Sequence, residues 1–250
     1  MSVRVLVTVG ALAVIGACLA AAALSLPPAD LLVGPYGPLL VELAVQEART
    51  VNAVAAVLFD LRPSDTLGEA LALFAAAAGL QLVLRPVSGE RRREVPRVAV
   101  AGRRPPPTSD AIRAVVLGLV APTAALAVFF SLRGHLSVGG GLQGGLLAAT
   151  AFAFVLLAGQ YRRQRWLAPE TWLDGGEAIS VGGYLLVGIA GLVVGAAFLE
   201  NVLPVGEFGA LLSSGTIVVL SLLVAVEAAA AVLLLLEEME DESYELERAP

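Results

Sequence analysis

Ionisable residues gather just before and just inside the apolar segment 66–84. Asp60, Arg62 and Asp65 precede the segment, and Glu69 lies about one turn into it. If the segment crosses a membrane, ionisable groups at this depth are costly unless they pair or line an ion path. Glu69 and Asp65 are therefore candidates for proton or cation transfer. Asp60 either shares this role or neutralises Arg62.

The same stretch fits a purely structural pattern. In Thr66-Leu67-Gly68-Glu69 the threonine hydroxyl would accept from a backbone N–H of the first turn, and the glutamate would reach back to the threonine N–H, as in a capping box. We therefore expect Thr66 to cap a helix. Both interpretations of Glu69 stay open.

Glu227 stands alone among the uncharged residues of the segment 214–236. Desolvation in a bilayer would favour proton binding by its carboxyl group, which suits proton exchange. The alternative is that Glu227 faces a polar residue of a neighbouring protein in a complex.

A glycine-dense stretch follows His135, the only histidine. The imidazole is a candidate proton relay or a structural hydrogen-bonding residue. The Lys-Ser/Thr ending of a phosphate-binding loop is missing, so we expect no nucleotide binding. Glycine instead lets the backbone turn sharply and expose carbonyl groups to a water-filled path. The predicted loop contains Gly139, Gly140, Gly141, Gln143, Gly144 and Gly145.

One histidine and one cysteine are too few for a metal site of these residues or for a Ser/His/Asp or Cys/His catalytic centre. We therefore expect no catalytic residue, no metal and no cofactor, and no enzyme activity of the chain on its own.

The elements that position these residues are membrane helices. Of the 250 residues, 58% are hydrophobic and 15% are charged, and the mean hydropathy of +0.83 exceeds that of ordinary soluble domains. About 20 apolar residues cross a hydrocarbon core of roughly 30 Å. The sequence predicts an all-α, polytopic membrane protein with about six transmembrane helices, at 5–26, 66–84, 112–132, 143–160, 178–199 and 214–236.

Arginine marks the expected cytoplasmic side. All 16 basic residues are arginine, and most lie in 85–113 and 162–165. The positive-inside rule makes both connections cytoplasmic, so both termini also lie inside, including the acidic tail 238–250. In the fifth predicted span, Gly191 and Gly195 form a GxxxG pattern, which predicts close helix packing in lipid.

Two membrane units are expected on either side of 87–107, where proline and arginine prevent a continuous helix. The unit 108–237 resembles the MnhB/MrpB family, a component of the multisubunit Mrp-type Na+/H+ antiporters, through Gly134-His135 and the run Gly139-Gly140-Gly141-Leu142-Gln143-Gly144-Gly145-Leu146. The unit 1–86 resembles the E-type component of membrane-bound hydrogenases and the C-terminal part of the large A-type antiporter component. This second resemblance rests on Val51-Asn52-Ala53-Val54 followed by Asp60, Arg62, Asp65, Thr66, Leu67, Gly68 and Glu69.

The resemblance implies a subunit of a complex in the cell membrane of a prokaryote that exchanges Na+, or a related cation, for H+. It implies large A- and D-like partner subunits and small C-, E-, F- and G-like ones within the lipid bilayer, and no nucleic acid. The chain would help form the ion path and hold its neighbours together. Two alternatives stay open: a membrane-arm subunit of an energy-converting hydrogenase or related respiratory complex, and a scaffold that does not transport.

Overall fold

The computed structural model describes residues 36–84, 109–158 and 168–246, with a few isolated positions before residue 36. The chain divides into two compact units, Met1–Glu42 and Leu43–Pro250. Every regular element within the described ranges is a helix, which confirms the expected all-α fold. The elements are α2 (Tyr36–Gln46), α3 (Ala53–Ala56), the π-helix η2 (Val57–Leu61), α4 (Pro63–Leu84), α6 (Asp110–Arg133), α7 (Gly141–Leu157), α9 (Glu170–Val193) and α10 (Thr216–Leu246).

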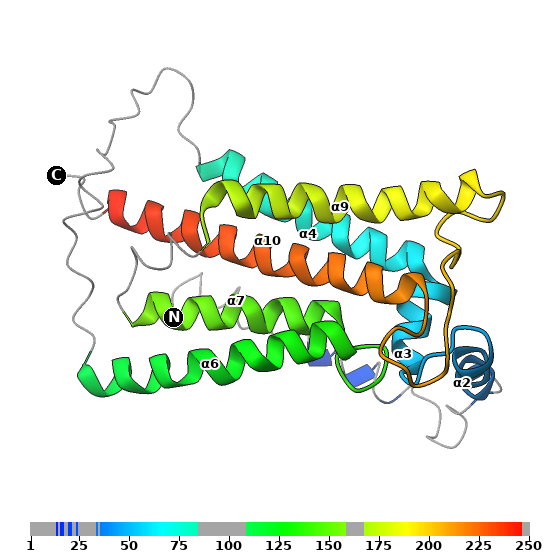
Figure 1. Ribbon diagram of the computed structural model, residues 1–250. Coiled ribbons are helices and arrows are strands. Elements are labelled where there is room, and N and C mark those ends of the chain that lie inside the picture. The colour runs from blue at the N-terminus through cyan, green and yellow to red at the C-terminus, as the bar shows by residue number, and fades with distance from the viewer. Residues whose placement is uncertain are drawn as a thin grey trace. The chain divides into compact units, whose positions relative to one another are not determined.

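The central helix of the second unit is α10. It packs against α7, α9 and α4, and α7 in turn packs against α6, so the long helices lie side by side (Figure 1). Of the residues in the most apolar window of α10, 61% are buried by the described part of the chain, whereas the share for α6 is 6%. A polar residue on α10 therefore meets protein, while most of α6 is left for lipid or for other subunits.

Four helices in the described residues are long and apolar enough to cross a membrane: Pro63–Val83, Asp110–Arg133, Thr171–Val193 and Thr216–Glu237. α7 is apolar as well but has 17 residues. The expected span 5–26 lies outside the described residues. The chain is thus a multi-pass membrane protein, and five of the six predicted spans correspond to four long helices and one short one in the part that is described.

Small residues set the packing of this unit. Ala228 and Ala231 of α10 are completely buried, next to the clusters formed by Tyr184, Ile217 and Leu220 and by Leu173, Leu233 and Leu234. Lipid tails are as apolar as these side chains, so hydrophobic burial does not drive membrane helices together. Close contact between backbones, which small side chains permit, supplies the attraction instead.

The helix α9 starts earlier than the sequence predicts. We expected a span at 178–199, whereas the helix runs from Glu170 to Val193 after Pro169, whose fixed φ suits the entry to a helix. Glu177 consequently lies well inside the helix instead of just before it. Hydropathy alone places the start too late because Asp174 and Glu177 lower the average of this stretch.

The GxxxG glycines serve a turn in this chain. α9 ends at Val193, and Gly195 beyond it has a φ of +84°. A Cβ atom on Gly191 would lie 2.5 Å from the carbonyl oxygen of Ala197. The two glycines therefore let the chain fold back tightly after α9, in place of the expected contact between two helices.

Candidate functional site

A helix break lies between η2 and α4. The Arg62 N–H donates to the carbonyl of Val57 at 2.9 Å, and Arg62 then leaves helical geometry with φ −138° and ψ 48°. Proline is favoured at the first position of a helix because its missing N–H has no role there, which explains why α4 begins at Pro63. Short π-helical segments often mark functional sites. A break in the helix thus precedes the full-length span α4.

Side chains from two helices satisfy the backbone at this break. The Thr66 hydroxyl donates to the carbonyl of Leu58 at 2.7 Å. The Tyr184 hydroxyl of α9 donates to the carbonyl of Pro63 at 3.0 Å and also lies within hydrogen-bonding reach of Thr66. The capping-box prediction for Thr66 is wrong, because α4 starts earlier and Thr66 already lies inside it, where its hydroxyl serves the preceding turn.

The charged residues at the break have different partners from those expected. Arg62 forms an ion pair with Asp65, and both side chains are at least half exposed. Asp60 is half buried, and burial raises its pKa, against a hydrogen bond with Asn201 that lowers it. The charges of Glu47 and Glu200 raise this pKa further. Asp65, and not Asp60, thus neutralises Arg62.

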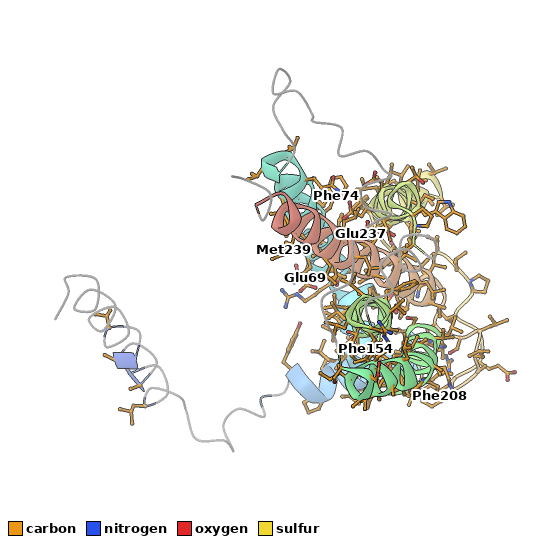
Figure 2. The ribbon with its side chains drawn as sticks, turned by 90° about the vertical axis from the view of Figure 1, so that its left-hand side faces the viewer. Glu69, Phe74, Phe154, Phe208, Glu237 and Met239 are labelled. Atoms are coloured by element: carbon orange, nitrogen blue, oxygen red, sulfur yellow. The ribbon has the colours of Figure 1, made fainter. Side chains whose placement is uncertain are left out.

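Glu69 lies on α4 and is exposed on the surface of the chain. It acts electrostatically on Tyr184, the residue that closes the break from α9. Figure 2 labels Glu69 on α4, together with Phe74 of the same helix and Glu237 of α10. The carboxyl group belongs to a membrane-length helix, and the described residues of the chain leave it exposed.

The glycine-rich loop is held by the segment before α3. Thr50 donates its hydroxyl to the carbonyl of His135 at 2.5 Å, and the backbone N–H groups of Val51 and Asn52 donate to the same oxygen. The Asn52 side-chain amide donates to Gly134 at 2.6 Å and to Ser137 at 3.0 Å. Residues 50–52 thus donate hydrogen bonds to three carbonyl groups of this loop.

His135 is buried in this loop, with 3% of its surface exposed. Burial lowers the pKa of His135, although hydrogen bonds with the backbone of Ala210 and Leu211 raise it, and the nearby charge of Arg133 lowers it again. The imidazole is therefore neutral near neutral pH. Its Nε2 atom has no hydrogen-bond partner within the described residues, so both the structural role and the proton relay stay predictions.

The predicted glycine loop ends at Gly140, where α7 begins. Gly141 and Gly145 face α10: a Cβ atom on Gly145 would lie 2.8 Å from the Cβ of Ala228, and one on Gly141 would overlap the carbonyl of Ser221. Gly144 faces α6 instead, at Ser131. Three of the singled-out glycines therefore let α7 fit between its two neighbours. Gln143 is exposed, and Gly139 keeps a positive φ of +139° in the loop.

A second carboxyl group accompanies Glu227. Glu227 of α10 and Glu177 of α9 are 2% and 4% exposed, and they interact electrostatically with each other. Within the described residues, one side-chain oxygen of each glutamate has no hydrogen-bond partner. Sequence reasoning missed Glu177 because the predicted span began at residue 178, one position after this glutamate. The helical spacing of Glu177, Ser180 and Tyr184 would have put all three on one face.

Comparison with known proteins identifies the second half of the chain. Residues 111–234 match the model of a domain related to the MnhB subunit of Na+/H+ antiporter. An uncharacterised protein of Methanocaldococcus jannaschii is 32% identical over 169 residues, which make up 63% of this chain and 62% of that protein. The match thus spans less than two thirds of the length of that relative.

Two solved structures share the fold. A chain of the membrane-bound sulfane sulfur reductase, an archaeal respiratory membrane complex, is 25% identical, with a TM-score of 0.69 over 95% of this chain and 98% of that one. A chain of the Mrp complex from Dietzia sp. DQ12-45-1b is 22% identical, with a TM-score of 0.70 over 96% of this chain and 26% of that one. This second likeness concerns the fold alone.

The four membrane-length helices in the described residues define a multi-pass helical membrane protein. Residues 111–234, just under half of the chain, form a domain related to the MnhB subunit of Na+/H+ antiporter.

Proposed function

We propose that this chain is a membrane subunit of a multisubunit Mrp-type antiporter that exchanges Na+, or a related cation, for H+. The observation that carries the proposal is the match to the MnhB-related domain, because residues 111–234 include both the glycine-rich loop and Glu227. In this role the chain contributes to the ion path and to the assembly of the complex, and does not transport ions alone.

The ion path draws on two places in the second unit. The first place is the helix break, where the backbone leaves regular helix geometry at Arg62. The other candidates near this break are Asp60, Asp65 and Glu69. Glu227 lies further along, on α10. Non-helical backbone within a membrane protein is tolerated where it lines a cavity or is covered by protein, and such breaks commonly serve ion binding. His135 joins this set through the loop, as a neutral hydrogen-bonding group.

Exposed surfaces on two helices favour contacts with partner subunits. Glu69 is exposed on α4, and the membrane-length window of α6 is 6% buried. A carboxyl group that faced lipid in the middle of a span would be unstable, so a neighbouring protein of the complex is the favourable cover. The partners we propose are large A- and D-like subunits and small C-, E-, F- and G-like subunits, with Na+ and H+ as the transported ions.

The proposal also covers the division of the chain into units and its orientation in the membrane. The unit 1–86 corresponds to a part like the E-type hydrogenase component or the A-type antiporter component, joined through 87–107 to the MnhB-like unit 108–237 and the acidic tail 238–250. The complex lies in the cell membrane of a prokaryote with both termini of this chain in the cytoplasm, as the arginine distribution favours.

Transport in everted vesicles tests the function. A pH gradient is formed in vesicles that carry the full complex, and its collapse on addition of Na+ is followed with a pH-sensitive dye. We expect collapse with the full complex and none in vesicles from cells that lack this chain only. Na+-dependent collapse that persists at full strength without the chain would overturn the proposal.

A second candidate is a membrane-arm subunit of an energy-converting hydrogenase or related respiratory complex, which the domain match does not favour. The likeness to the sulfane sulfur reductase chain runs over 95% of this chain and 98% of that one. Mass spectrometry of the complex purified gently from its native membrane separates the two candidates. Large antiporter-like subunits without redox proteins support the antiporter, whereas iron–sulfur or nickel subunits would support the respiratory complex. Recovery of the chain without any partner protein would argue against both candidates.

A further inference from the structure

Three buried oxygen-bearing side chains meet between α9 and α10. Glu177 and Ser180 of α9 are 4% and 1% exposed, and Glu227 of α10 is 2% exposed. Within the described residues, the Ser180 hydroxyl and one carboxyl oxygen of each glutamate have no hydrogen-bond partner. Buried polar atoms are nearly always satisfied in folded proteins, so a group of orphans indicates a missing ligand.

The register of the two helices places these side chains at one level. A Cβ atom on Gly176 would contact Val226 and Ala230, and one on Gly183 would contact Leu223. The helices are therefore antiparallel, and Glu177 and Ser180, which lie between these glycines, are level with Glu227. Glu177 and Ser180 are three residues apart and share a face of α9.

No basic side chain is available along these helices to balance the pair. The ranges of α4, α7, α9 and α10 contain no arginine, lysine or histidine. The other ionisable groups on them are acidic or phenolic: Asp174 acts on Glu177, Glu69 acts on Tyr184, and Asp65 is paired with Arg62. α7 has no ionisable residue, and the remaining acidic groups of α9 and α10 lie at their ends, at Glu170 and from Glu237 onwards.

Two ionised carboxylates in this setting would be very unstable. Each would lose its hydration in an apolar interior, and each would repel the other. Paired carboxyl groups in other proteins solve the same problem by holding one proton between them. The Ser180 hydroxyl, on the same face of α9 as Glu177, forms no hydrogen bond within the described residues and is therefore free to donate to an ionised oxygen of the pair.

We propose that Glu177 and Glu227 form a carboxyl pair that binds and releases one proton inside the membrane, with Ser180 as its hydrogen-bond donor. This assignment deepens the proposed function, since it names a proton site for the transporter and adds Glu177 to it. From the pair, Tyr184 continues the polar face of α9 toward Thr66 and the helix break. The pair thus lies at one end of a polar line that leads to the ion-path candidates on α4.

The test is labelling of the purified complex with dicyclohexylcarbodiimide, a lipid-soluble reagent that modifies protonated carboxyl groups, followed by peptide mass spectrometry between about pH 6 and about pH 9. We expect label on Glu177 or Glu227 and chains that carry one label far more often than two. The reagent modifies the glutamate that holds the proton, and the other, which is already ionised and no longer has a partner to share a proton with, escapes the reagent.

Single variants test the coupling directly. In Glu177→Gln we expect labelling of Glu227 near pH 8 to fall about tenfold, and in Glu227→Gln we expect the same fall in labelling of Glu177. The reason is that the apparent pKa values of a strongly coupled pair differ by at least about one unit from those of its separate members. Glu207→Gln, which removes an exposed carboxylate from the loop after α9, should change neither. Should either variant fail to assemble, the ratio of single to double labels in the wild-type complex decides.

Two results would overturn the inference: absence of label from both glutamates over this pH range, or labelling of each that is unaffected by loss of the other. Protection by Na+ at constant pH would also overturn it, because a metal cation and not a proton would then be the occupant. Labelling requires neither an ion gradient nor transport. A failed transport experiment therefore leaves this result standing, and the reverse also holds.

Discussion

The side-chain amide of Asn52 donates a hydrogen bond to the carbonyl oxygen of Gly134 at 2.6 Å, across 82 positions of the chain. The amide oxygen of the same residue accepts from the N–H groups of Val54 and Ala55 and caps α3. One side chain thus fixes both the start of the helix before the break and the glycine-rich loop. Two sequence motifs that lie far apart form a single structural unit.

Substitution of Asn52 tests this unit. We expect Asn52→Ala to destabilise the chain by about 2 to 4 kcal/mol, since it removes a helix cap and hydrogen bonds to the loop, each worth about 1 kcal/mol. Asn52→Asp keeps the cap and loses the donors, so it should show part of this effect. The measurement is the midpoint of detergent-induced unfolding. Equal midpoints for wild type and Asn52→Ala would contradict the assignment.

The hydroxyl of Thr66 holds the carbonyl of Leu58 at the helix break. Thr66→Val keeps the shape of the side chain but leaves this carbonyl without its donor, which should destabilise the break by about 1 to 2 kcal/mol. We expect faster amide hydrogen exchange in residues 57–66 and unchanged exchange in α7. Thr66→Ser, which keeps the hydroxyl, serves as the control. Exchange as slow as in wild type would show that the hydrogen bond has no such role.

The raised pKa of Asp60 predicts that the stability of the chain depends on pH. Its pKa is raised in the folded chain, chiefly by burial, so the folded state binds a proton more readily than the unfolded state. The contribution to stability is full below the unfolded pKa and is lost as the pH rises through the folded pKa. Asp60→Asn removes the titrating group. We therefore expect this variant to melt higher than wild type at about pH 7 and no higher at about pH 4. A stability difference that is the same at both pH values would contradict the effect.

Gly145 lies where α7 and α10 touch. A Cβ atom there would lie 2.8 Å from Ala228 and closer still to the carbonyl of Ala225. Gly145→Ala should therefore destabilise the chain by about 1 to 3 kcal/mol. Gly182→Ala on α9 has nothing within 4 Å and should be neutral or slightly stabilising. The folded fraction of each variant by size-exclusion chromatography gives the comparison, and equal behaviour of both would contradict the close packing.

Glu69→Gln tests the ion-path role of the exposed carboxyl group on α4. We expect the complex to assemble normally and Na+-dependent proton transport to fall at least about tenfold, because a permanently neutral amide binds neither a proton nor a cation in the same way. Glu207→Gln is the control for loss of an exposed carboxylate elsewhere. Undiminished transport by an assembled Glu69→Gln complex would instead favour a scaffold role for this residue.

Hydropathy and motif reasoning recover the fold well. The long apolar stretches at 112–132 and 214–236 predict α6 and α10 closely, because a lipid-spanning helix requires an uninterrupted run of apolar residues. The break before α4 is also predictable, since Pro63 follows Asp60 and Arg62 and cannot continue the preceding helix. Here local chemistry alone decides the structure.

The site is less predictable from sequence because it depends on contacts between distant segments. A window average reports the polarity of Glu177 but not the helix face it occupies, and only the contact with α10 shows that it meets Glu227. Thr66 fits a capping pattern equally well whether or not the helix starts at Pro63. The carbonyl of Leu58 then decides its role, and no local pattern contains that information.

The shortness of α7 has a consequence for the surrounding lipid. Its 17 residues rise about 26 Å, less than the roughly 30 Å of a typical hydrocarbon core. Such a mismatch thins the bilayer locally or draws the end of the helix below the headgroups. The loop before α7 then borders hydrocarbon, where water does not replace lost hydrogen bonds. Thick membranes should therefore strain this loop more than thin ones, and the contacts from Thr50 and Asn52 are what make its depth tolerable.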